Sequence, residues 1–150
     1  MSEFYNLLFV FIGLIGFGLI FNIKKEKIIY TAIGGVLTSF IYIISCFFIS
    51  NIFLCNIIAS IFATLFSEIS ARLYKAPATV FLILSIIPLA PGGSLYYTII
   101  NIISGNSEKF NEYGKITAMT TLGIAAGIII ASVFIRTYAK TKLYEKIIKK

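Results

Sequence analysis

Five apolar stretches, each about as long as a membrane-spanning helix, make up most of this 150-residue chain. A helix needs about 20 mostly apolar residues to cross roughly 30 Å of hydrocarbon. Each stretch must be helical, because a strand with an open edge would leave backbone groups unpaired in lipid. The stretches cover residues 4–23, 28–50, 52–72, 78–103 and 116–136. The sequence therefore predicts an all-α integral membrane protein, a single membrane domain of about five transmembrane helices over residues 1–150.

The residue composition supports a membrane protein. Hydrophobic residues make up 59% of the chain and charged residues 13%, whereas a soluble domain carries about 25% charged residues. The first apolar stretch is followed, not preceded, by Lys24, Lys25 and Lys27, and a secretory signal peptide has its positive charge first. We therefore interpret the first stretch as a retained helix that contacts the lipid bilayer.

Two residue types that hydrolytic enzymes depend on are missing from the chain. It has no His and no Asp, which removes Ser–His pairs, aspartate pairs and His-based zinc sites. Glu68 is the one acid beside an apolar span, so no pair of acids can divide the roles of proton donor and acceptor. Cys46 and Cys55 are interpreted as thiols packed among helices. We expect no enzyme activity, no cofactor and no metal.

Eleven of the thirteen basic residues fall on one side of the predicted membrane. The other side has Lys109 and Lys115, in a predicted loop over residues 104–115. Basic residues concentrate in the cytoplasmic loops of membrane proteins. This placement accounts for the positive charge of the chain, so we expect no nucleic-acid partner. We expect the N-terminus outside and the C-terminus in the cytoplasm, with a helical tail that leaves the membrane. The eleven residues are Lys24, Lys25, Lys27, Arg72, Lys75, Arg136, Lys140, Lys142, Lys146, Lys149 and Lys150.

The fourth apolar stretch is interrupted by two prolines and two glycines. Proline removes a backbone donor and clashes with the preceding helical turn, and glycine loosens the chain further. The fourth helix is therefore predicted to be broken by Pro-x-x-Pro-Gly-Gly, with a second half-helix starting near Gly93 or Ser94. At about 1.5 Å per residue from Ala78, Pro88 lies roughly 15 Å deep, near the middle of the bilayer. Residues 78–103 could instead dip in and return, which would put the tail outside, against the charge distribution.

A discontinuous helix at the membrane midplane is how many transporters form their substrate site. The start of the second half-helix would offer free N–H groups and the positive end of the helix dipole, which suit a carboxylate, and Ser94 is a candidate N-cap. The alternative is a proline kink that serves only packing. We expect substrate binding or gating from Pro88, Pro91, Gly92, Gly93, Ser94 and Thr98.

A second set of polar residues recurs every four positions along the third stretch. Asn56, Ser60, Thr64 and Glu68 share one helical face, and we expect the first three to lie opposite Ser94, Thr98 and Asn101 across the site. Glu68 and Arg72 have the i, i+4 order that favours an ion pair. Their depth puts both near the cytoplasmic interface, where we interpret Glu68, Arg72 and Lys75 as gate or partner contacts. The alternative for the whole stripe is hydrogen bonding between helices.

Small residues indicate where helices approach closely. Gly123, Gly127 and Ala131 recur every four residues in the last stretch and form a seam on which another helix can pack. We expect a similar packing role for the glycines of the first two stretches, Gly13, Gly16, Gly18, Gly34 and Gly35.

The run from Arg72 to Phe81, RLYKAPATVF, and the run from Ile87 to Tyr96, IPLAPGGSLY, resemble the C-terminal half of the threonine/serine exporter (ThrE) family. More closely, the chain is similar to the stand-alone, YjjB-like small subunit of the split form of that transporter. The resemblance extends over most of the chain. It carries over no established ligand residue, so the carboxylate site at the break rests on the residues alone.

The resemblance implies export of small carboxylate-bearing metabolites, threonine and serine or dicarboxylates such as succinate, across the bacterial cytoplasmic (inner) membrane. It also implies a larger membrane subunit that resembles the N-terminal half of the family, and transport driven by an ion gradient. An alternative function is a non-transporting structural or assembly subunit of a membrane complex, which the small-residue seams would also suit.

Overall fold

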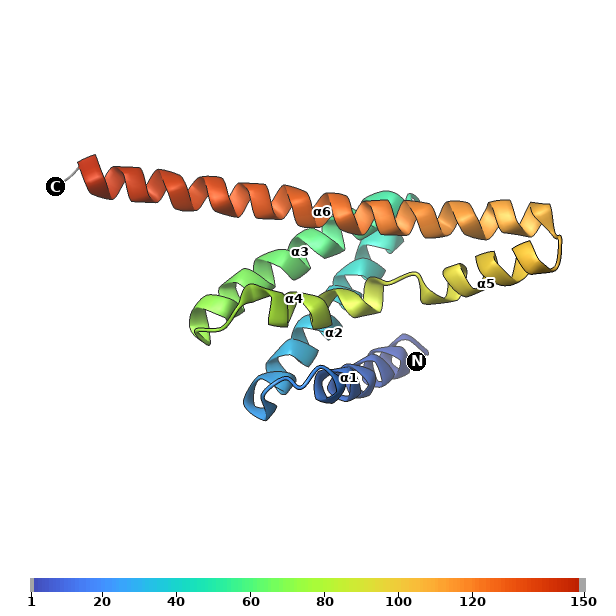
Figure 1. Ribbon diagram of the computed structural model, residues 1–150, viewed down its shortest axis with the longest axis horizontal. Helices are drawn as coiled ribbons and strands as arrows, with labels where there is room; N and C mark the ends of the chain where they lie inside the picture. The colour runs from blue at the N-terminus through green and yellow to red at the C-terminus, as the bar shows by residue number, and fades with distance from the viewer. Residues whose placement is uncertain (1, 149–150) are drawn as a thin grey trace.

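The computed structural model describes the backbone of residues 2–148 and the side chains of residues 5–138. Those residues form helices without a strand (Figure 1), which confirms the all-α prediction. The tail lysines Lys140, Lys142, Lys146, Lys149 and Lys150 lie outside the described side chains. The helices are α1 (Ser2–Ile20), α2 (Lys25–Phe48), α3 (Ile52–Leu73), α4 (Ala78–Ile86), the short 3₁₀ helix η1 (Ile87–Leu89), α5 (Gly92–Ile103) and α6 (Ser107–Ile148).

Three helices, α2, α3 and α6, are long and apolar enough to cross a membrane, and α4–η1 with α5 form a fourth, bent candidate. The chain is a membrane protein. The first predicted span ends earlier than expected: α1 ends at Ile20 instead of residue 23, and Asn22, between α1 and α2, takes a left-handed conformation with φ of 52°. The predicted loop over residues 104–115 is also shorter, because α6 already begins at Ser107.

Helix α3 is the centre of the bundle. It packs against α2 and α4 and most extensively against α6, while α1 packs on α2. The buried residues of α3 are all small or polar, which lets its neighbours come close: Cys55, Asn56, Ala59, Ser60, Ala63, Thr64, Ser67 and Ser70.

Two glycines of α2 mark close contacts with α4. A Cβ added to Gly34 would lie 2.8 Å from Ser85 Oγ, and one added to Gly35 would lie 2.9 Å from the carbonyl oxygen of Leu84. The packing role predicted for these two glycines is therefore confirmed. An added Cβ at Gly13 or Gly16 would meet nothing within 4 Å, so the packing predicted for them is not present in the single chain.

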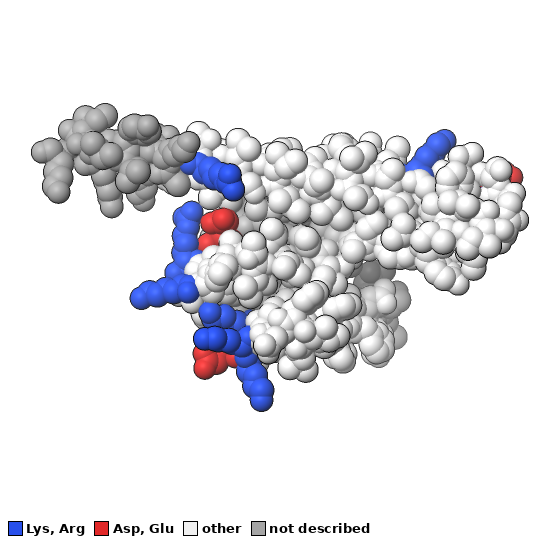
Figure 2. All heavy atoms as spheres, viewed as in Figure 1, with Lys and Arg blue, Asp and Glu red and all other residues white. Residues whose placement is uncertain are grey.

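Helix α5 stands apart from the bundle. Its extensive contacts are with α6 alone, and none of its residues is buried. Figure 1 shows α5 and the first turns of α6 as a hairpin that projects beyond the other helices. Figure 2 shows Lys and Arg gathered at the opposite end, over the start of α2 and the end of α3. The two ends of the molecule therefore differ in charge as well as in shape.

Candidate functional site

The broken fourth helix has a defined backbone path. The 3₁₀ helix ends at Leu89, Ala90 is extended with φ of −59° and ψ of 130°, and α5 begins at Gly92. The two halves are bent by 57°. Backbone hydrogen bonds close the break, from Ala90 N to Ile87 O at 3.1 Å and from Leu95 N to Pro91 O at 2.9 Å. The predicted break is present, with the new half-helix starting at Gly92 instead of Gly93 or Ser94.

The first turn of α5 is open to its surroundings. An added Cβ on Gly92 or Gly93 would meet no atom within 4 Å. The N–H of Gly92 bonds to Ala90 O at 2.8 Å, while those of Gly93 and Ser94 have no backbone acceptor within the described chain. Ser94 is not the N-cap that the sequence predicts. Pro91 holds that position, and the Ser94 hydroxyl donates back to the Pro91 carbonyl at 3.2 Å.

A polar cluster joins α5 to α6. The hydroxyl of Thr117 donates to that of Ser94 at 2.9 Å and lies 3.4 Å from that of Thr98. Asn101, predicted on the same face, donates instead to the carbonyl of Tyr97 within α5. Thr117 is not among the site residues predicted from the sequence. The signal that would have found it is the group of three threonines in the first half of the last span, Thr117, Thr120 and Thr121.

The polar stripe of α3 faces α6, not α5. Asn56, Ser60 and Thr64 are buried, and a Cβ added to Gly123 of α6 would lie 2.9 Å from Asn56 Cβ. At Gly127 an added Cβ would overlap Ser60 Oγ. The expectation that the stripe lies across the site from Ser94 and Thr98 is therefore wrong. The physical reason is that the glycines of α6 have no side chains, so the backbone of α6 occupies the space beside the stripe.

Most polar atoms of the stripe are satisfied within α3. Ser60 Oγ donates to the Asn56 carbonyl at 2.7 Å, and Thr64 Oγ1 donates to the Ser60 carbonyl at 2.8 Å. Asn56 Nδ2 donates to the Ile52 carbonyl at 2.8 Å. The exception is Asn56 Oδ1, which is buried and has no hydrogen-bond partner within the geometric limits among the described residues. The hydroxyls of the stripe thus bond within their own helix, with one acceptor left over.

A cavity of about 420 Å³ borders the break, between α4 and α6. Pro91 and Ala90 form its edge on one side, and Thr121 is the polar side chain on the other. The remaining lining residues are Ile83, Ile86, Ile87, Ile124, Ala125 and Ile128. A carboxylate here would therefore have to be bound by backbone N–H groups and hydroxyls, because no basic side chain lines the cavity.

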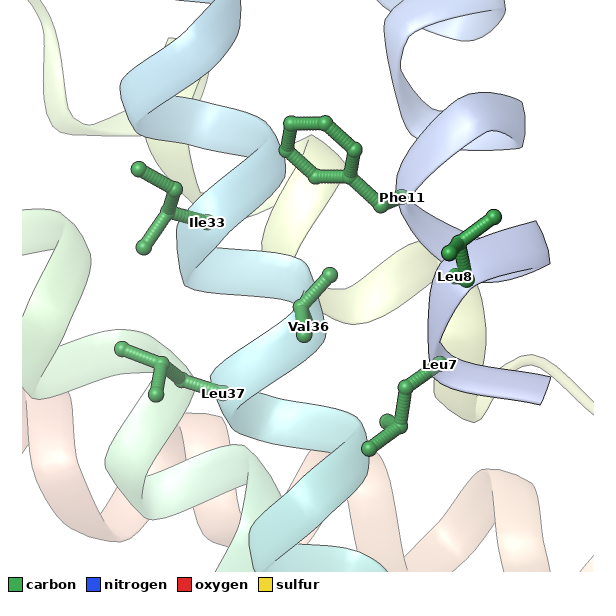
Figure 3. A pocket seen from close by; sticks show the side chains of 6 residues that line it. All are labelled: Leu7, Leu8, Phe11, Ile33, Val36 and Leu37. Carbon is green, nitrogen blue, oxygen red and sulfur yellow. The ribbon is translucent and has the colours of Figure 1, made fainter. Parts of the chain in front are cut away.

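A second cavity, of about 350 Å³, lies between α1 and α2. Figure 3 shows that it is lined by apolar side chains from the two helices, Leu7, Leu8, Phe11, Ile33, Val36 and Leu37. It offers no side-chain donor or acceptor to a metabolite. Its lining suits a lipid chain, so we do not assign a substrate to it.

The predicted ion pair between Glu68 and Arg72 is present. Glu68 Oε2 lies 3.8 Å from an Arg72 guanidinium nitrogen, and the side chains are 37% and 65% exposed. Both line a cavity of about 170 Å³ between α3 and α6. Lys75 does not line this cavity; it is exposed in the α3–α4 turn with φ of 47°. The structure thus brings together two of the three residues assigned to this end.

Beside Lys75, an aromatic cluster fixes the turn into α4. The rings of Tyr30 and Tyr74 are 4.6 Å apart, and those of Tyr74 and Phe81 are 5.9 Å apart. The hydrogen bond with the Tyr30 hydroxyl, with burial as a second cause, raises the pKa of Tyr74 to about 12. The Tyr74 phenol therefore stays protonated even at pH values where an ordinary tyrosine, with a pKa near 10, begins to ionise.

In the comparison with known families, one family model matches most of the chain. The family model described as threonine/serine exporter, ThrE, matches residues 6–134. No solved structure matches the chain.

Proposed function

The chain belongs to the threonine/serine exporter family, ThrE, and we propose that it is the small, YjjB-like subunit of a two-component secondary transporter. In this proposal a larger membrane subunit, similar to the N-terminal half of the family, works with it. Together they export threonine and serine, or dicarboxylates such as succinate, across the bacterial cytoplasmic membrane. The N-terminus lies outside and the C-terminus in the cytoplasm.

The observation that carries this proposal is the open first turn of α5. The N–H groups of Gly93 and Ser94 have no backbone acceptor among the described residues, and the N-terminus of a helix carries roughly +0.5 of an elementary charge. A substrate carboxylate can accept from these groups, as anions do at other helix N-termini. The hydroxyls of Ser94 and Thr117 lie beside the same turn.

The exposure of α5 supports the need for a larger partner. None of its residues is buried in the single chain, and an unpaired backbone group in lipid costs several kcal/mol. A second subunit that packs on α5 and on the cavity beside Pro91 would remove these groups from lipid. It would also enclose the substrate, because the single chain leaves Gly92 and Gly93 open.

The test is export of labelled threonine, serine and succinate from cells that carry both subunits. We expect Gly92→Leu to abolish export at normal expression, because its side chain would cover the first turn of α5. Gly16→Leu is the matched control, since Gly16 also meets no neighbour within 4 Å but lies in α1. Unchanged export by a normally expressed Gly92→Leu protein would show that the break is not the site.

A structural or assembly role predicts a different result. The larger subunit alone would then transport at the full rate in reconstituted vesicles, and this chain would raise only its expression or stability. Transport that needs both subunits, and that Gly92→Leu abolishes, supports the transport role.

A further inference from the structure

The cavity between α3 and α6 is lined by a negatively charged and a positively charged side chain that are neighbours. Its polar lining residues are Glu68, Arg72 and Tyr138. The charge distribution favours a cytoplasmic position for this end of the bundle, from which an exporter takes its substrate. The remaining lining is apolar and comes from Leu65, Ile69, Phe134 and Ile135.

The Glu68–Arg72 pair is loose. Its N–O separation of 3.8 Å is well beyond the roughly 2.7–2.9 Å of a charge-assisted hydrogen bond. Exposed pairs of this kind add little to stability, so the pair is not required to hold the fold. The guanidinium has five N–H donors and the carboxylate about four acceptor positions, so both groups can bind a ligand while they remain neighbours.

We propose that this cavity is the cytoplasmic binding site for a small zwitterionic amino acid. The Arg72 guanidinium binds the carboxylate of the ligand, and the Glu68 carboxylate binds its ammonium group. An α-amino acid carries both groups on one carbon, so they are close enough together to meet two neighbouring side chains of opposite charge. The inference rests on the proposed transport function and gives it a second, separate site.

The same charges discriminate against a dicarboxylate. A dianion can pair with Arg72 through one carboxylate, but it has no cation for Glu68, and its second carboxylate would be repelled. Like charges close together disfavour binding, and because Glu68 is 37% exposed, water screens part of this repulsion. Of the two substrate classes in the proposed function, the cavity therefore selects amino acids over succinate.

The size and lining of the cavity fit a small ligand. Its volume of about 170 Å³ is below the roughly 300–1,000 Å³ of pockets for drug-sized molecules. Tyr138 also lines the cavity and offers a phenol that can bond to a side-chain hydroxyl, while Ile135 and Phe134 can contact a methyl group. These are the two groups that a threonine side chain presents.

The cavity between α3 and α6 also lies on the same helix, α6, as the cavity beside Pro91, so substrate can pass from one to the other. Ile135 lines it, and Ile128 lines the cavity beside Pro91. The two isoleucines are seven residues apart on α6, which puts them on one face and about 10 Å apart along the axis. A substrate released by Glu68 and Arg72 would thus move two helical turns along α6 to reach the cavity beside Pro91. Thr117, at the first turn of α5, lies eleven residues further along α6.

The test uses the two-subunit complex in inside-out vesicles, where the cytoplasmic face meets the bath. We expect Glu68→Gln to raise the KM for threonine about tenfold, with Vmax little changed and succinate transport equal or faster. Arg72→Gln should raise the KM for both substrates. Glu112→Gln, an exposed glutamate of the opposite end, is the matched control and should leave both constants unchanged.

A charge exchange keeps the test decisive if a single variant folds poorly. Glu68→Arg should lose threonine binding, and the double variant Glu68→Arg with Arg72→Glu should recover most of it, because both charges are again present. If the pair has only a structural role, the double variant should fold normally and the KM for threonine should be the same in all of these variants.

Binding of labelled threonine to the purified complex separates this inference from the proposed function. Transport that needs Gly92, with a threonine KM that Glu68→Gln leaves unchanged, would leave the transport site standing and overturn the cytoplasmic site. Binding that depends on Glu68 in a complex that transports nothing would support the cytoplasmic site and overturn the transport proposal. Absence of both binding and transport would overturn both.

Discussion

The hydroxyl of Thr117 in α6 donates a 2.9 Å hydrogen bond to the hydroxyl of Ser94 in the first turn of α5. The Thr117 hydroxyl also lies 3.4 Å from that of Thr98, one turn further along α5. Since α5 has extensive contacts with α6 alone, this cluster fixes where the second half-helix starts. The position of the candidate site is therefore set by α6 and not by the polar stripe of α3.

We expect Thr117→Val to lower the export rate about threefold, because one hydrogen bond between membrane helices contributes about 0.6 kcal/mol. Valine keeps the shape of threonine and removes only the hydroxyl. Thr117→Ser is the control, since it keeps the hydroxyl and should retain most of the activity. Initial rates of threonine export at equal protein levels measure both, and equal rates for the two variants would show that the hydroxyl has no role.

The α3–α6 contact makes a prediction about stability. A Cβ at Gly127 would lie 2.6 Å from the carbonyl oxygen of Ile57, so Gly127→Ala must push the helices apart. Overpacking of this kind costs roughly 1–3 kcal/mol. We expect a clearly lower midpoint of thermal unfolding in detergent. Gly13→Ala, where an added Cβ meets nothing within 4 Å, should leave the midpoint unchanged or raise it slightly.

The α3 stripe shows how far the sequence alone could lead. The spacing of Asn56, Ser60 and Thr64 puts them on one face of a helix, and the structure has them there. Spacing within one helix says nothing about which helix covers that face. Two candidate neighbours, the half-helix after Pro91 and the seam at Gly127, were both compatible with the sequence, and only the packed structure distinguishes them.

The ion pair and the break were easier to predict because each is a local property. The Glu68–Arg72 pair needs only one turn of helix, and the break follows from the missing donors of Pro88 and Pro91. The loop over residues 104–115 was harder. Its charged residues look like a water-exposed loop, yet Ser107 already begins α6, because alternating charges are also compatible with a solvated helix.

Straightening the break should make the protein more stable and abolish transport. Proline in a helix interior costs about 3 kcal/mol, so the double variant Pro88→Ala with Pro91→Ala favours a continuous helix from α4 into α5. We expect a higher midpoint of thermal unfolding and loss of export. Pro77→Ala is the control, because Pro77 is the N-cap of α4 and interrupts no helix. Full export by the double variant would show that the bend of 57° is not needed.

The proposed orientation can be tested with single cysteines. Lys24→Cys and Ser107→Cys, both at exposed positions, would be introduced after Cys46 and Cys55 are replaced by alanine. A membrane-impermeant maleimide added to intact, outer-membrane-permeabilised cells should label the cysteine at position 107 and leave the one at position 24 unlabelled. Disruption of the inner membrane should expose both. Labelling of position 24 in intact cells would reverse the orientation expected from the basic residues.

The exposed face of α5 should be where the larger subunit binds. Ile103 of α5 and Ile20 of α1 are 79% and 76% exposed, so they are matched positions for a cysteine that carries a photoreactive cross-linker. Helix α5 combines this exposure with unpaired backbone groups at Gly93 and Ser94, and covering those groups in lipid favours association by several kcal/mol. We therefore expect cross-links to the larger subunit from Ile103→Cys and few from Ile20→Cys. Equal yields from the two positions would contradict a specific contact at α5, and products made of two copies of this chain would show that the chain pairs with itself there.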